Sequence, residues 1–147
     1  MLPTLALLAG LTAASVHARV AGPWAVTGMA MNGYDSPADA FKDLRMTFAR
    51  DRVTVTNKAD AIASGRVRVL AASGPVVTFD LLMGEGPDAG KTFPGRLEWA
   101  DRDTLRVRLL QPGKERPTGV RSEPDDRSAV VALKRLKPVP APKGGER

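Results

Sequence analysis

The chain has 147 residues, of which 43% are hydrophobic, 26% charged and 5% aromatic, enough for one modest domain and too few for a large multidomain enzyme. It has no cysteine and a single histidine, His17, so disulfides, thiolate metal sites and thiol nucleophiles are excluded. The 22 Lys and Arg exceed the 16 Asp and Glu, and the net charge of +6 gives a basic surface without the charge density of a nucleic-acid-binding tail.

The first 18 residues form an apolar stretch that ends in small side chains. They contain no Asp, Glu, Lys or Arg, and Val16-His17-Ala18 is typical of a signal-peptidase site. No basic residue precedes the apolar run, so a buried first helix and an uncleaved anchor remain alternatives. The run is shorter than the ~20 apolar residues of a membrane-spanning helix. We expect residues 1–18 to be a signal peptide, cleaved near Ala18, and the mature chain to be periplasmic or secreted, without a membrane span.

From residue 20 onward, apolar and polar residues alternate with a period of two in eight short runs. This alternation predicts strands with one buried face. Short turn sequences separate neighbouring runs, which favours a meander, and a meander that closes on itself leaves no exposed edge. We therefore predict an all-β fold, a small eight-stranded up-and-down barrel, with a two-sheet β-sandwich as the alternative. The runs are 24–28, 44–48, 53–56, 66–71, 77–81, 96–99, 105–109 and 129–135.

One face of these runs carries large apolar side chains that we expect inside the barrel. An eight-stranded barrel is just wide enough to be filled by its own side chains or to hold one small molecule. The sequence leaves both interpretations open: a cavity for a lipid-like or aromatic molecule, or a filled barrel that acts through its basic exterior or its Pro-rich tail. The inward set is Met46, Phe48, Phe79, Leu81, Leu97, Trp99 and Leu105.

Two loops carry further signals. Ser36-Pro37-Ala38-Asp39 predicts one or two helical turns, with Ser36 as the N-cap and Pro37 at the first helical position. Residues 84–92 end in Gly90-Lys91-Thr92 like a phosphate-binding loop, but Glu85 stands where that motif needs its first glycine and a strand follows instead of a helix. The segment is therefore interpreted as a long hairpin connection.

The outward positions and turns give no sign of catalysis. Acidic residues at turns are explained by turn chemistry, and the expected mature chain has neither histidine nor cysteine. We expect no enzyme activity, no catalytic residue, no metal site and no cofactor, and the protein partner stays open. A nucleic-acid-binding face would need interleaved aromatic residues, so no specific nucleic acid is expected. The outward basic residues are Arg45, Arg66, Arg68, Arg96, Arg106 and Arg108.

Short motifs in a fixed order run through residues 20 to 135. The chain resembles a lipocalin-like domain family abundant in Planctomycetes proteins of unknown function, departing from it at Leu110 and Gly119-Val120. The motifs are Gly22-Pro23-Trp24, Gly65, Phe79-Asp80-Leu81, Gly90-Lys91-Thr92, Asp103-Thr104-Leu105-Arg106-Val107, Arg116-Pro117-Thr118 and Leu133-Lys134-Arg135.

The resemblance implies a barrel domain over residues 19–135 whose first-strand tryptophan, Trp24, is covered by a basic residue of the last strand. Alternation independently places Arg135 on the inward face of that strand, so we expect Trp24 and Arg135 to close one end by a cation–π contact. Arg116 is expected to pin its loop at the barrel mouth or, alternatively, to meet an anionic ligand group. Residues 136–147, rich in proline, predict an extended solvated tail.

Overall fold

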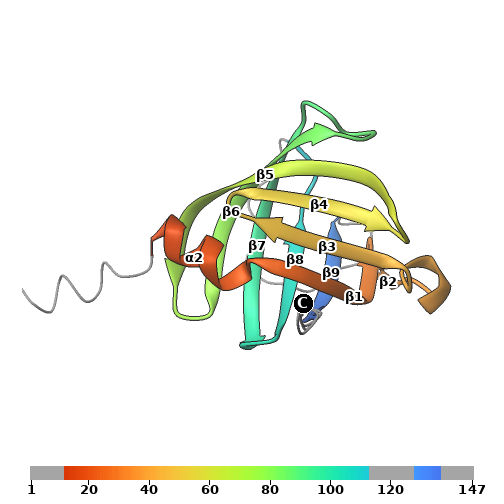
Figure 1. The fold of residues 1–147 in the computed structure, drawn as a ribbon, viewed down its shortest axis with the longest axis horizontal. Coiled ribbons are helices and arrows are strands. Elements are labelled where there is room, and N and C mark those ends of the chain that lie inside the picture. Colours follow the sequence, from red (N-terminus) through yellow and green to blue (C-terminus); the bar gives the residue numbers. More distant parts are fainter. Residues whose placement is uncertain (1–11, 113–127, 137–147) are drawn as a thin grey trace, which may run out of the picture.

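A computed structural model describes residues 12–112 and 128–136 and shows a closed antiparallel β-barrel (Figure 1). Each barrel strand pairs with the next one along the chain, and β1 also pairs with β9, which closes the sheet. The prediction of an eight-stranded up-and-down barrel is confirmed, with the short β2 as an addition beside the end of β1. The strands are β1 (Gly22–Met31), β2 (Tyr34–Asp35), β3 (Leu44–Ala49), β4 (Arg52–Asn57), β5 (Asp60–Ser73), β6 (Val76–Glu85), β7 (Thr92–Asp101), β8 (Thr104–Leu109) and β9 (Ala129–Arg135).

The two ends of the barrel differ in their connections. At one end, tight turns join β3 to β4, β5 to β6 and β7 to β8, and the helix α2 (Ala13–Val20) leads into β1 there. We call this the α2 end. Longer connections, 32–43 and 86–91, lie at the opposite end, which we call the mouth. Strand β8 ends and β9 begins at the mouth. Residues 113–127, which include the Arg116 motif, lie outside the described residues, as do 1–11 and the expected tail from 137 on.

The helix α2 belongs to the hydrophobic core. Thr12 caps it, since the Thr12 Oγ1 accepts a hydrogen bond from the Ser15 main-chain N at 3.1 Å. Val16 and Val20 lie one turn apart on the same face, and both are buried. Ala18, the expected cleavage position, lies within this helix on its exposed side. Residues 13–20 thus have the structure of the buried first helix that the sequence left as an alternative.

Bulges in two strands change which side chains face inward. Simple alternation over the run 24–28 would put Gly28 on the inward face with Trp24 and Val26, but a register shift between Val26 and Gly28 adds a residue to β1 and reverses the face. Beyond the bulge, Met29 and Met31 line the barrel interior instead. A second shift, between Val69 and Ala71, likewise places Ala72 against the core, where unbroken alternation from Val67 and Val69 would place Ala71.

The helical turn after β2 begins one residue later than expected. It is a single 3-10 turn, η1 (Ala38–Ala40), and its N-cap is Pro37, without a side-chain cap. The prediction of Ser36 as the N-cap is wrong, because the Ser36 main-chain N donates to the Met29 main-chain O at 2.8 Å and so continues the pairing of β2 with β1.

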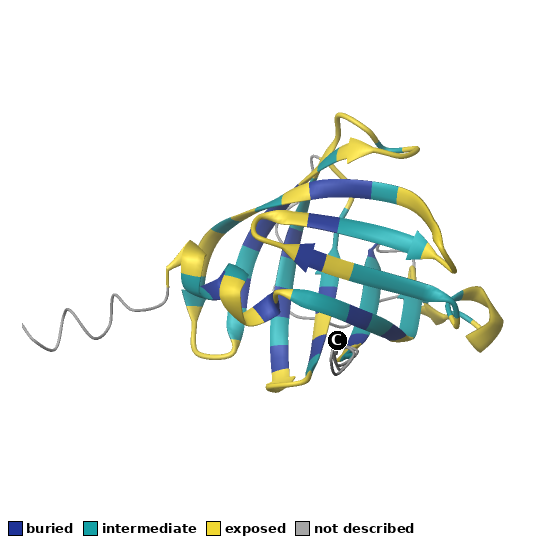
Figure 2. Cartoon of the chain, viewed as in Figure 1, coloured by how far each residue is buried: buried dark blue, intermediate teal, exposed yellow. Residues whose placement is uncertain are grey.

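Nearly all buried positions lie on the strands and on α2, whereas most residues of the turns are exposed (Figure 2). The core is densest near the α2 end, where Trp24, Leu105 and Leu133 are fully buried. Among the residues that the structure describes, no helix combines the length and the apolar character needed to cross a bilayer.

Candidate ligand-binding cavity

A cavity of about 640 Å³ occupies the half of the barrel nearer the mouth. Every one of the eight barrel strands contributes to its wall, and fourteen of its nineteen described lining residues are apolar or glycine. The apolar and glycine positions are Val26, Met29, Met31, Leu44, Met46, Val53, Val55, Gly65, Leu81, Met83, Phe93, Leu109, Ala129 and Val131.

Methionine is concentrated in this wall. Met29, Met31, Met46 and Met83 are all the methionines that the structure describes, and each lines the cavity. Met31, next to the mouth, leaves about half of its surface exposed. Because methionine has a flexible unbranched side chain with a polarizable sulfur, such a wall adapts to guests of different shape.

Five polar residues complete the lining: Asn32, Ser64, Asp88, Gln111 and Ser128. Ser128 is almost fully buried, and its main-chain O accepts a hydrogen bond from the Asn32 main-chain N at 3.0 Å. The Asp88 carboxylate forms an ion pair with Lys91 at 3.3 Å. Among the described residues, no Lys or Arg lines the cavity, so Asp88 is the one charged side chain in its wall.

A second space of about 40 Å³ lies beyond the cavity, toward α2. Met46, Val53, Leu81 and Leu109 line both spaces and therefore form the constriction between them. At this size the second space holds no more than about one water-sized group. Its other lining residues are Val16, His17, Val20, Phe48, Val67, Val77, Phe79, Leu97 and Val107.

The structure divides the predicted inward set into three groups. Met46 and Leu81 lie at the constriction, whereas Phe48, Phe79 and Leu97 line only the small space. Trp99 and Leu105 line neither space and are buried in the core. Much of the cavity wall was missed, including Met29, Met31 and Met83. The signal for Met83 was available, since it continues the alternation of Phe79 and Leu81 by two residues.

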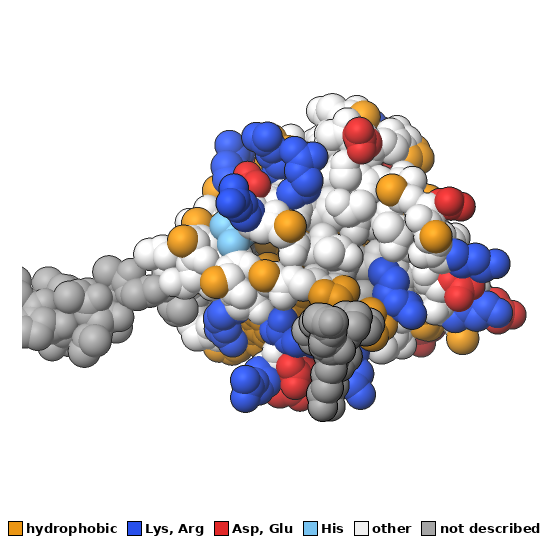
Figure 3. All heavy atoms as spheres, in the orientation of Figure 1, with side chains coloured by type: hydrophobic (Ala, Val, Ile, Leu, Met, Phe, Trp, Pro, Cys, Tyr) orange, Lys and Arg blue, Asp and Glu red, His pale blue; other side chains and the backbone are white. Residues whose placement is uncertain are grey.

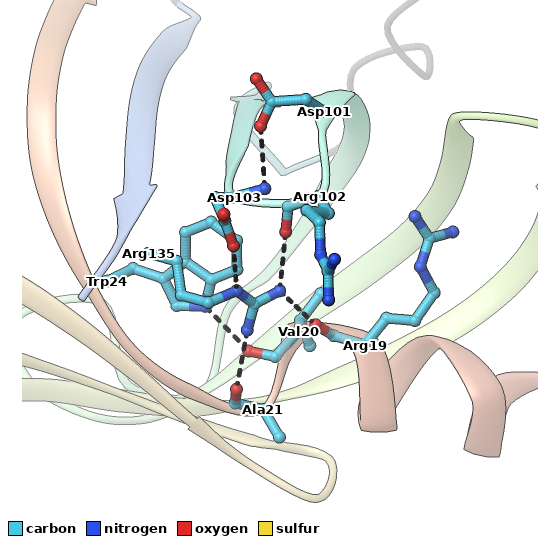
Figure 4. A network of polar contacts seen from close by, with 8 residues as sticks. All are labelled: Arg19, Val20, Ala21, Trp24, Asp101, Arg102, Asp103 and Arg135. Carbon is cyan, nitrogen blue, oxygen red and sulfur yellow. Dashed lines mark hydrogen bonds and ion pairs between the residues drawn. The ribbon is translucent and has the colours of Figure 1, made fainter. Parts of the chain in front are cut away.

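Two tryptophans and two arginines close the α2 end (Figure 4 shows one pair). The expected partners meet: Cζ of Arg135 lies 4.4 Å from the ring centroid of Trp24. Arg19, at the end of α2, covers Trp99 at the same distance, which the sequence did not indicate. The two indole rings are 5.9 Å apart and inclined at 59°. The two arginines and the two indole rings therefore close this end by packing. Each cation–π contact stabilises it by ~0.5–2 kcal/mol.

Arg135 also joins three segments by hydrogen bonds (Figure 4). Its Nη2 donates to the main-chain O of Arg19 at 2.8 Å and of Arg102 at 3.0 Å, and its Nη1 donates to the main-chain O of Ala21 at 3.2 Å. Its Nε donates to the Asp103 Oδ1 at 3.1 Å. Because the last carbonyls of a helix lack partners within the helix, a cation placed there stabilises α2 against the barrel.

The turn between β7 and β8 is held by its own side chains. The Asp101 Oδ1 accepts a hydrogen bond from the Asp103 main-chain N at 2.8 Å. This bond, with a further one from Thr104, lowers the pKa of Asp101 below its ordinary value. The ionised Asp101 therefore fixes the turn that presents Asp103 and the Arg102 carbonyl to Arg135.

The exterior arginines do not form a uniform basic belt. Arg68 pairs with Asp80 at 2.8 Å and Arg96 with Glu98 at 2.8 Å. Figure 3 shows one face of the molecule, on which basic side chains gather toward the α2 end and mix with acidic ones elsewhere. The remaining predicted positions also lie on strands: Arg45 on β3, Arg66 on β5, and Arg106 and Arg108 on β8.

Within residues 12–112 and 128–136, no group of three or more His, Cys, Asp or Glu side chains is arranged to hold a metal ion. No protein-family model matches the chain, no curated protein matches its sequence, and no solved structure matches its fold. The inference of function therefore depends on the cavity and on the closed α2 end.

Proposed function

We propose that this protein binds a small apolar molecule in the barrel, admitted through the mouth and stopped by the constriction at Met46 and Leu81. The observation that carries the proposal is the cavity of about 640 Å³ with a mostly apolar wall. Ligand sites in proteins are typically cavities of ~300–1,000 Å³ with an apolar lining and a few polar groups. Burial of apolar surface supplies the affinity, at about 25 cal/mol per Å² removed from water.

The distribution of side-chain volume explains why the space is there. The largest side chains, such as Trp24, Trp99 and Phe79, lie toward the α2 end. The wall near the mouth includes small ones, Gly65, Ala129 and Ser128. Taking ~30 Å³ for each water-sized or methylene-sized group, the cavity has room for roughly 20 of them. A chain of ten to fifteen carbons or a molecule of two or three fused rings is of suitable size.

The proposal extends to the class of protein and to its location in the cell. The closed barrel with Arg135 over Trp24 supports a lipocalin-like binding protein, and binding rather than catalysis is consistent with the residues in the wall. The apolar residues 1–18 support export from the cytoplasm. Cleavage after Ala18 would cut α2 and remove Val16 from the core, so we propose that cleavage, where it occurs, leaves α2 intact.

Titration with N-phenyl-1-naphthylamine, an uncharged probe that fluoresces in apolar surroundings, tests the binding site. We expect saturable binding by the full chain at one site. Met83→Trp places bulk inside the cavity and should abolish binding, whereas Leu82→Trp adds the same bulk on the exposed face of β6 and should leave it unchanged. Val131→Phe is a second filling variant for use where Met83→Trp fails to fold. Equal binding by the inner and outer variants would refute the proposal.

A further inference from the structure

The charges around the cavity indicate which polar group its ligand carries. This inference rests on the proposed function, since it concerns the same cavity. The protein as a whole is basic, with a net charge of +6, yet none of its described Lys or Arg residues is in the cavity wall. A carboxylate brought into such a wall leaves water without gaining a cationic partner, which is unfavourable for a buried charge.

Among the described residues of the wall, the one charged side chain carries the wrong sign for an anionic ligand. Asp88 lines the cavity on the connection from β6 to β7, and its carboxylate is only half covered, with a relative exposure of 48%. Lys91 pairs with it at 3.3 Å but is not itself part of the wall. Because an ion pair this exposed is weak, Lys91 offsets the Asp88 charge only in part, and Asp88 adds a modest repulsion toward an anionic ligand.

The remaining polar groups suit an uncharged partner. Asn32 and Gln111 carry amides, which donate and accept hydrogen bonds, and Ser128 carries a hydroxyl. Asn32 and Gln111 are exposed, near the mouth, whereas the constriction at Met46 and Leu81 is entirely apolar. A bound molecule therefore keeps its apolar part at the constriction and its polar end at the mouth.

We infer that the cavity selects amphiphiles with an uncharged polar end, such as long-chain alcohols or esters, and discriminates against fatty-acid anions. A fatty acid and an alcohol of equal chain length bury the same apolar surface, so the difference between them reports on the polar end alone.

Competition for the bound N-phenyl-1-naphthylamine at pH 7.4 tests this directly, with decanol, methyl decanoate and decanoate as competitors on the full chain. We expect decanol and methyl decanoate to displace the probe at similar concentrations, and decanoate to need at least about tenfold more. Raising the salt concentration should leave decanol binding unchanged, because decanol carries no charge. For decanoate, salt screens the weak attraction to the basic exterior of the protein.

A matched pair of variants examines the role of Asp88. Asp88→Asn should strengthen decanoate binding by a factor of about 3–10 and leave decanol unchanged, since it removes the repelling charge. Asp39→Asn is the control, because Asp39 also pairs with a lysine three residues on, Lys42, but does not line the cavity. It should change neither affinity.

The outcomes separate this inference from the proposed function. Failure of the uncharged probe and of decanol to bind refutes the cavity as a binding site. Probe binding with decanoate competing as well as decanol overturns the present inference and leaves the binding function standing. A preference for decanoate that disappears in Arg116→Gln also overturns it, by assigning anion recognition to the segment between β8 and β9.

Discussion

Arg135 donates a hydrogen bond from Nη2 to the main-chain oxygen of Arg19 at 2.8 Å, so the last strand of the barrel holds the end of the helix that precedes the first strand. The same guanidinium packs on Trp24, whose Nε1 donates to the main-chain O of Val20 at 2.8 Å. Arg19 in turn packs on Trp99. Among the described residues, α2, the start of β1 and the end of β9 therefore form one connected unit at this end of the barrel.

Replacing Arg135 by methionine should destabilise the barrel strongly. The variant keeps an apolar side chain beside Trp24 but loses the cation and its hydrogen bonds, and we expect the free energy of unfolding to fall by about 2–4 kcal/mol. Urea denaturation followed by tryptophan fluorescence measures it. Arg106→Met, at an exposed position of β8, is the control and should stay within about 0.5 kcal/mol of the natural protein. Equal effects of the two substitutions would show that Arg135 does not hold this end together.

Val16 tests whether α2 is part of the folded domain. Val16→Ala in the full chain removes two buried methyl groups, and we expect a loss of about 1.5–2.5 kcal/mol of unfolding free energy. Ala18→Gln lies on the exposed side of the same helix and should change it by no more than about 0.5 kcal/mol. A neutral Val16→Ala substitution would contradict the packing of α2 against the barrel.

Gly95 lies opposite Phe79 in the pairing of β6 with β7. A Cβ atom at Gly95 would approach three atoms of the Phe79 ring more closely than 3.0 Å, so Gly95→Ala must displace a buried ring. We expect a destabilisation of about 1–3 kcal/mol, measured by thermal unfolding. At Gly28 the added Cβ meets only the Ala132 Cβ at 3.4 Å, and Gly28→Ala should be close to neutral. The reverse order of the two effects would be inconsistent with the packing of Phe79.

Acid should weaken the β7–β8 turn through Asp101. Its pKa is lowered in the folded state by the hydrogen bonds from Asp103 and Thr104, so ionised Asp101 stabilises the fold above the ordinary pKa of 3.8. That contribution is lost as the pH falls through the lowered value. We predict that the melting temperature of Asp101→Asn depends less on pH between 5 and 2 than that of the natural protein, while Asp39→Asn behaves like the natural protein. Parallel pH profiles for Asp101→Asn and the natural protein would argue against this role.

The barrel could be predicted from sequence because alternation reports on strands with one buried face. Alternation does not predict the bulges, because the extra residue near Gly28 reverses the inward and outward faces without a distinct local signal. The sequence alone does not separate a signal peptide over residues 1–18 from a helix that packs on the barrel, because both are apolar. Only the fold distinguishes Val16 as a buried residue.

The closed end was easier to predict than the cavity. Trp24 lies on the first strand of the barrel and Arg135 on the last. Closure of the barrel pairs these two strands, with Trp24 and Arg135 as partners in the register. Whether a barrel is filled depends on the summed volume of the side chains at each height along the barrel axis. Alternation predicts which face of the sheet a residue lies on, but not its height along that axis. The residues predicted to line a cavity are therefore divided among the constriction, the small space and the filled core.

Crystals grown with 10-bromodecanol test the binding site most directly, because bromine is located by its anomalous scattering. We predict one bromine peak inside the barrel, next to Met46 and Leu81, with the hydroxyl toward Asn32 and Gln111, and no such peak in Met83→Trp. A barrel interior without bromine, at concentrations where the alcohol is bound in solution, would contradict binding inside the barrel.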